Sequence, residues 1–274
     1  MNEYKKLYEI LKLPDAITDL ALGNLKFPDE ACNQPALCYG FPPALLPIWS
    51  NPDAMIYTGY WKHWFSDRRP SFVRLYVNIA YRTKEIACDA TQLFQEMILE
   101  ELTSHEGVTD EVSDFAKHLG VTNVEELNNL SIDSGDDPEG LLTLPAFKER
   151  APLMCFEDHS RYVGDFPHRG MALTYENMAK SCSLELGEIL EKEFFHSPVC
   201  PPWFMPIMKK ELFYQLLDDK KYADAWFTLN SNGWLFDDAK TALSKLAESV
   251  SDKDFHQLAE SWLSLNQSKY KLGY

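Results

Sequence analysis

Three segments decide the fold, and they read AMIYTGYW at residues 54–61, SFVRLYVNIAY at 71–81 and DATQLFQEMILEEL at 89–102. The first two are rich in β-branched and aromatic residues, which favour strands, and the polar turn between them is typical of a hairpin. Asp89 stands where an N-cap is expected, with Gln92 three residues later as in a capping box. The pattern predicts antiparallel strands followed by a helix that packs on them, with residues 83–87 as a short further strand.

The chain before this unit predicts a helix and then a loop. Residues 3–22 carry apolar side chains at helical spacing, and Pro14 is expected to break the helix. Residues 27–52 hold six prolines. Because proline cannot donate a backbone hydrogen bond, this region predicts an ordered loop with at most short strands.

The chain after the unit becomes helical. We expect a helix over residues 109–119 that ends at Gly120, and a short helix opened by a capping box of Thr122 and Glu125. Residues 141–204 show no clear period. Beyond residue 205, apolar residues recur at helical spacing in four short stretches, which predict four antiparallel helices.

These elements predict an α+β fold, with an N-terminal antiparallel sheet packed by helices and a mainly helical C-terminal region. Three segments follow from the change in pattern. Residues 1–105 form an α+β domain, residues 106–204 a mixed region, and residues 205–274 helical hairpins.

The bulk properties limit the functional classes. The chain has 274 residues and a net charge of −16, with net charges of −3 over residues 1–105 and −13 over residues 106–274. Such a field repels nucleic acid and anionic lipid and attracts basic partners. The six cysteines form no CxxC pair, and no stretch approaches the ~20 apolar residues that cross a bilayer. We therefore expect a cytoplasmic protein with reduced thiols, a basic protein partner, and no nucleic-acid or membrane partner.

The usual signatures of catalysis and cofactor binding are missing. The sequence has no GxGxxG, GxxxxGK[ST] or GxSxG. His105 and Glu106 lack the second histidine of a zinc-protease helix, and Gly135 stands where an EF-hand loop that began at Asp133 would need a side-chain oxygen. The sequence predicts neither a cofactor nor a metal ion.

Two groups of residues are predicted to bind a partner. The first is an aromatic and basic run after the first strand, and the second is an acidic turn. Aromatic side chains supply interface hot spots, although they also fill cores, and an acidic turn attracts a basic partner. The predicted partner-binding residues are Tyr60, Trp61, Lys62, His63, Trp64, Asp136, Asp137 and Glu139.

A polar cluster is the alternative site. Asp158, His159 and His168 lie near Cys155 in the sequence and hold the side chains of an acid–base pair or a metal site. Nothing in the sequence fixes whether they converge.

A partial family resemblance joins several of these segments. Residues 43–102 contain LPIWS at 46–50, IYTG at 56–59, a strand at 72–77 and EIACD at 85–89. This stretch resembles the SUKH superfamily, a group of bacterial immunity proteins and related regulators. The resemblance implies a sheet backed by helices and tight binding of a toxin, often a nuclease.

Three functional hypotheses follow. The first is a non-enzymatic immunity protein that neutralises a basic toxin of the nuclease type. The second is a regulatory or scaffold protein that binds a basic or helical partner through acidic C-terminal helices. The third is a hydrolase or metal-binding enzyme that uses the polar cluster. The oligomeric state stays open.

Overall fold

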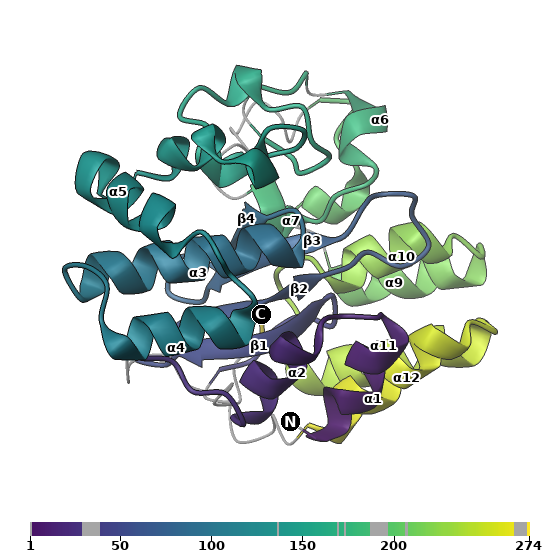
Figure 1. Cartoon of the computed structure of the whole chain (residues 1–274). Coiled ribbons are helices and arrows are strands. Elements are labelled where there is room, and N and C mark those ends of the chain that lie inside the picture. Colours follow the sequence, from purple (N-terminus) through teal and green to yellow (C-terminus); the bar gives the residue numbers. More distant parts are fainter. Residues whose placement is uncertain are drawn as a thin grey trace.

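The computed structural model describes residues 2–28, 39–135, 137–168, 170–172, 174–186, 197–205, 208–265 and 273–274. A four-stranded antiparallel sheet in the order β1-β2-β3-β4 lies in the middle of the molecule (Figure 1). Its strands are β1 (Leu45–Asn51), β2 (Ile56–Trp61), β3 (Ser71–Tyr76) and β4 (Arg82–Ala87). With the helices around it, the sheet confirms the α+β prediction.

Strand β1 lies in the proline-rich region for which only short strands were expected. It is an edge strand of seven residues, and its pairing with β2 is irregular between Pro47 and Trp49. Proline is tolerated at such an edge because no ladder hydrogen bond is lost there. Opposite it, Gly59 is required, because a Cβ atom at this position would lie 2.3 Å from the carbonyl oxygen of Leu46.

The longer helices agree well with the sequence pattern. Pro14 separates the first two helices, and Asp89 caps α3 by accepting a hydrogen bond from the Gln92 backbone. One predicted cap is wrong, because α5 begins after Asn123 and not at Thr122. The longer helices are α1 (Asn2–Ile10), α2 (Asp15–Leu22), α3 (Ala90–Ser104), α4 (Asp110–Leu119), α5 (Val124–Ser134), α9 (Lys209–Asp218), α10 (Tyr222–Leu229), α11 (Phe236–Ser249) and α12 (Lys253–Ser264).

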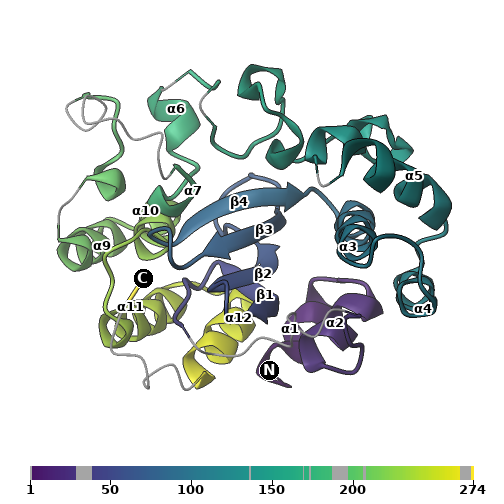
Figure 2. The same cartoon turned by 90° about the vertical axis from the view of Figure 1, so that its left-hand side faces the viewer.

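The sheet is enclosed by helices on both faces. Figure 2 shows α3 on one side of the sheet and the C-terminal helices α9, α10, α11 and α12 on the other. Helices α4 and α5 lie beyond α3, and α1 and α2 lie near β1 and α12 (Figures 1 and 2). The four predicted C-terminal helices are therefore confirmed.

Residues 137–186 form an irregular segment, which we call the arch, over the edge strand β4 (Figure 2). Its turns are too short to produce a periodic pattern, which explains why the sequence predicted little here. Side-chain hydrogen bonds attach it to β4: Thr83 Oγ1 donates to the carbonyl of Leu184, and the Glu85 carboxylate accepts from the Leu153 backbone and from the Tyr162 hydroxyl. In its described residues, the arch contains four 3₁₀ turns and two short helices. They are η1 (Pro138–Thr143), η2 (Pro145–Phe147), η3 (Leu153–Cys155), η4 (His159–Arg161), α6 (Tyr175–Met178) and α7 (Ser183–Leu186). A further turn, η6 (Pro202–Phe204), precedes α9.

The three predicted segments contribute to one hydrophobic core. Its buried side chains come from all parts of the chain, from Tyr4 to Tyr274. Two hydrogen bonds join the first segment to the last: the Ala44 backbone donates to Asn230, and the Trp262 indole donates to the carbonyl of Phe41. The boundaries at residues 105 and 204 stay predictions, but the packing across them is continuous. No helix in the described ranges has the length and apolar character needed to cross a bilayer.

Candidate functional site

The aromatic run is mostly part of the core. Trp61, His63 and Trp64 are only 1%, 4% and 4% exposed, so their assignment to a partner-binding surface is wrong. Tyr60 and Lys62 are half-buried, and the Lys62 ammonium lies 4.8 Å from the Trp64 ring centroid. Because the run itself carries no information about distant segments, it could not reveal that the C-terminal helices cover it.

Helices α10 and α12 provide that cover. The Trp64 ring centroid lies 6.3 Å from that of Trp226 and 5.8 Å from that of Phe255. The His63 ring lies 4.8 Å from that of Phe227. The run is thus a contact between the sheet and the C-terminal helices.

A buried polar cluster lies where α7 of the arch meets β2 and the loop after it, and we call it the Glu185 cluster. Glu185 Oε1 accepts from the Trp61 indole at 2.9 Å and lies 2.6 Å from the Arg68 guanidinium and 3.2 Å from His63 Nε2. Its other oxygen accepts from the Cys182 backbone at 2.8 Å. The cluster therefore ties β2 and the following loop to α7, which is more than a hundred residues away in the sequence.

The electrostatics of the cluster favour one ion pair. Burial opposes ionisation of Glu185, but Arg68 and His63 outweigh it and hold the pKa of the carboxyl well below its usual range. Burial lowers the pKa of His63 despite the neighbouring carboxylate, so the imidazole stays neutral at pH 7. Burial and Glu185 raise the pKa of the Cys182 thiol well above its usual value.

The same cluster resembles a metal site in composition. Ligand atoms of His63, Cys182 and Glu185 lie within 4.8 Å of one another. However, Arg68 already neutralises the carboxylate, the thiol is protonated, and all three side chains are buried. A divalent ion would have to displace the guanidinium from a closed space, so this cluster fits a structural ion pair better than a metal centre.

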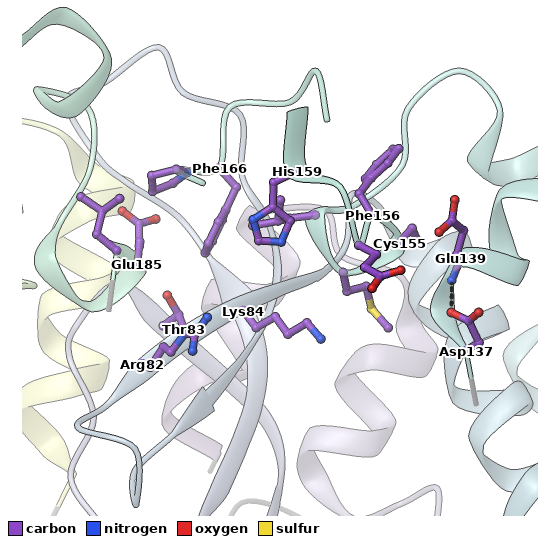
Figure 3. Close-up of a pocket in the computed structure, with 15 residues that line it drawn as sticks. Arg82, Thr83, Lys84, Asp137, Glu139, Cys155, Phe156, His159, Phe166 and Glu185 are labelled. Atoms are coloured by element: carbon purple, nitrogen blue, oxygen red, sulfur yellow. Dashed lines mark hydrogen bonds between the residues drawn. The ribbon is translucent and has the colours of Figure 1, made fainter. Parts of the chain in front are cut away.

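A cavity of about 420 Å³ lies between β4 and the arch. Figure 3 shows Lys84 in its middle, with Glu185 towards one end and Asp137 and Glu139 towards the other. The lining residues are Arg82, Thr83, Lys84, Asp137, Glu139, Leu153, Met154, Cys155, Phe156, Glu157, His159, Phe166, Pro167, Glu185 and Leu186. Of the predicted acidic turn, Asp137 and Glu139 line this cavity, and Asp136 lies outside the described residues.

The alternative polar cluster does not assemble as an acid–base pair. His159 lines the cavity, but Asp158 is exposed and uses its carboxylate to cap η4 through the Ser160 backbone. The His168 ring is perpendicular to that of His159 at 6.2 Å. Burial, together with Glu96 and Glu85, raises the pKa of Cys155 to about 12, so this thiol is a poor nucleophile.

A second buried polar cluster connects the other face of the sheet to α3. The Arg74 guanidinium lies 2.6 Å from carboxylate oxygens of both Glu96 and Glu100. Burial raises the pKa of Glu96 to about 8, because it outweighs the attraction of Arg74, and Glu100 raises it further. Glu96 is thus a proton-binding carboxyl at neutral pH.

This pKa predicts a pH dependence of stability. The folded protein keeps a proton on Glu96 that the unfolded chain releases above its ordinary pKa of 4.5. The free energy of unfolding should therefore fall as the pH rises from about 4.5 to about 8, by about 4 kcal/mol. We expect Glu96→Gln to remove this fall, and urea unfolding of both proteins across that range measures it. Glu100→Gln removes a carboxylate that raises the pKa of Glu96, so it should reduce the fall without abolishing it. Parallel pH profiles of wild type and Glu96→Gln would contradict the prediction.

Most residues of the two buried clusters had no signal in the sequence that marked them. Glu185 lies in the region without periodicity, and Arg68 stands in a polar turn where an exposed side chain is expected. Glu96 lies on the core face of α3, four positions before Glu100. A charged residue on the buried face of a predicted helix is the one feature that could have indicated a buried ion pair.

Comparison with known proteins identifies no similar protein. No protein-family model matches the sequence, and neither the curated proteins nor the solved structures give a match. The resemblance to the SUKH superfamily therefore stays a prediction.

Proposed function

We propose that this chain is a non-enzymatic cytoplasmic protein that binds a basic protein partner, such as a toxin of the nuclease type that it neutralises. The observation that carries the proposal is the distribution of charge on the surface. Residues 100–139 contain 12 acidic residues and one lysine, with no arginine. A partner that binds nucleic acid presents the complementary charge.

Six of these acids form what we call the acidic face. They lie on α4 and α5, all are exposed, and none forms an ion pair with Lys or Arg in the described part of the chain. They are Asp110, Glu111, Asp114, Glu125, Glu126 and Asp133. Ile132 of α5 is 72% exposed, and it supplies apolar surface beside these charges.

The buried clusters support a role without catalysis. The Glu185 cluster combines an imidazole, a thiol and a carboxylate, but all three side chains are buried and the thiol is protonated. Its donors and acceptors are used to join the sheet to α7. A catalytic group has to reach a substrate, so this cluster supports stability better than chemistry.

The C-terminal helices are less suited to a basic partner than the acidic face. Residues 205–274 contain 10 acidic and 9 basic residues, and residues 106–204 contain 19 acidic and 7 basic residues. The expectation of acidic C-terminal helices is therefore wrong. The charge of these helices does not support the hypothesis of a scaffold that binds a basic partner through them.

Isolation of the partner tests the proposal directly. The tagged full-length chain is purified from its native host at low salt, and co-purifying proteins are identified by mass spectrometry. We expect a stoichiometric basic protein whose toxicity the chain relieves. Recovery of the chain alone, or of an acidic partner, would refute the proposal.

The acidic face makes a prediction about binding rates. Neutralising Asp110, Asp114, Glu125 and Asp133 with Asn or Gln should slow association with that partner by about tenfold at low salt, because electrostatic attraction speeds encounter. Stopped-flow or surface-based kinetics at two salt concentrations measures the effect.

The matched control removes the same charge elsewhere. Glu211, Asp218, Asp254 and Glu260 are exposed acids of the C-terminal helices, and their neutralisation should change association much less. Equal slowing by both quadruple variants would assign the effect to net charge and remove the acidic face as the binding surface.

A further inference from the structure

The cavity under the arch has two walls of opposite charge. Arg82 and Lys84 stand on the β4 wall, and Asp137, Glu139 and Glu157 stand on the arch wall. Lys84 forms no ion pair with these carboxylates in the described part of the chain, so the ammonium and the carboxylates lie more than 4.0 Å apart. Burial lowers the pKa of Lys84, and the neighbouring cations Arg74 and Arg82 lower it further. An occupant that carries both charges, well separated, would be attracted to both walls.

The strand that forms the first wall is an edge strand. β4 pairs with β3 alone, and within the described ranges the arch is attached to it through the side chains of Thr83 and Glu85. The three residues 82–84 line the cavity consecutively and span roughly 10 Å of extended backbone. Backbone groups on such an edge can bind an extended peptide by strand addition.

The remaining lining is apolar. Met154 and Phe156 are half-buried and supply the apolar surface on which hydrophobic side chains can pack, and buried Phe166 and Leu186 lie behind it. A volume of about 420 Å³ falls in the range of ordinary ligand pockets. The cavity thus combines an open strand edge, apolar contacts, and opposite charges at separated positions.

We propose that this cavity binds a short peptide with free termini, about three residues long, as an added strand beside β4. The peptide carboxylate binds at Lys84 and Arg82, and its ammonium binds at Asp137 and Glu139. The apolar side chains pack on Met154 and Phe156. This site is separate from the acidic face, and its occupation does not depend on the proposed protein partner.

Arg161 competes with the peptide ammonium. Its guanidinium pairs with Glu139 and lies 5.8 Å from the Phe156 ring centroid, so it holds one of the carboxylates of the arch wall. Both side chains are partly exposed, and such a pair costs little to break. Removal of Arg161 should therefore free Glu139 for the ligand.

The test uses a defined probe. Tripeptides built from Ala, Leu, Phe and Lys are mixed with the full-length chain at about 1 mM each, and native mass spectrometry detects the bound members. We expect one-to-one complexes. The same mixture with acetylated N-termini and amidated C-termini should bind at least tenfold more weakly. Absence of any bound tripeptide, or equal binding of the blocked mixture, would overturn the proposal.

Variants then assign the two ends of the best-bound peptide. Lys84→Met and Glu139→Gln should each weaken binding about tenfold, and Arg161→Met should strengthen it. Lys84→Met should not weaken binding of the amidated peptide, which has no carboxylate for Lys84 to bind. Glu139→Gln should not weaken binding of the acetylated peptide, which has no ammonium for Glu139 to bind. Each comparison is a double-mutant cycle. The exposed controls Lys148→Met and Glu149→Gln should leave affinity unchanged. Weakening that is the same for free and blocked peptides would show a structural effect and contradict the assignment.

Discussion

Arg68→Met is expected to lower the free energy of unfolding by about 3–5 kcal/mol. The substitution leaves the buried Glu185 carboxylate without its closest cation, 2.6 Å away, while His63 stays neutral beside it. It also removes the donor to the carbonyl of Lys180. Urea unfolding, followed by circular dichroism at pH 7, measures the change.

The neighbouring residue provides a matched control. Arg69 is exposed and carries the same charge in the same turn, so Arg69→Met should change stability by less than about 0.5 kcal/mol. The double variant Arg68→Met/Glu185→Met removes both charges and should recover much of the loss, because two packed apolar side chains can replace a buried ion pair. A loss below about 1 kcal/mol for Arg68→Met, or no recovery in the double variant, would contradict a tightly coupled pair.

A fragment of residues 1–105 is not expected to fold, although it contains the whole sheet and α3. Without the C-terminal helices, the side chains of Trp61, His63 and Trp64 would be exposed on one face of the sheet. The Ala44 backbone would also lose its hydrogen bond to Asn230. Each large aromatic side chain contributes about 1.5–3 kcal/mol by its burial, which is a large share of the stability of any domain.

Heteronuclear NMR of the purified fragment measures this outcome. We expect poorly dispersed amide signals. Association with a second fragment of residues 106–274 should restore the dispersion. A dispersed spectrum of the first fragment alone, with cooperative unfolding, would show that the boundary near residue 105 separates independent domains.

The sequence predicted the parts of the fold that local interactions determine. The hairpin strands, the Asp89 cap and the C-terminal helices depend on spacing within a few residues, and all are present. β1 was underestimated because Pro47 argued against a strand, and only its edge position makes the proline acceptable.

The candidate sites depend on contacts between distant residues. Trp61 contacts α7 and His63 contacts α10, both more than a hundred positions away, so alternation along the strand cannot reveal whether these side chains face solvent or the core. Glu139 and Lys84 line one cavity because the arch passes over β4, and the arch has no period to predict. The net negative charge indicated a basic partner, but it did not locate the binding surface in the C-terminal helices, because most of the excess acidic residues lie before residue 205.

The burial of the tryptophans has a consequence for optical spectroscopy. All seven indoles in the chain lie in the core, with none at the surface: Trp49, Trp61, Trp64, Trp203, Trp226, Trp234 and Trp262. The folded protein should therefore fluoresce at short wavelength and resist a water-borne quencher such as acrylamide, because the emitting rings are shielded from solvent. Emission from this protein reports the state of its interior alone, and a red shift on mixing with another molecule would signal opening of the core.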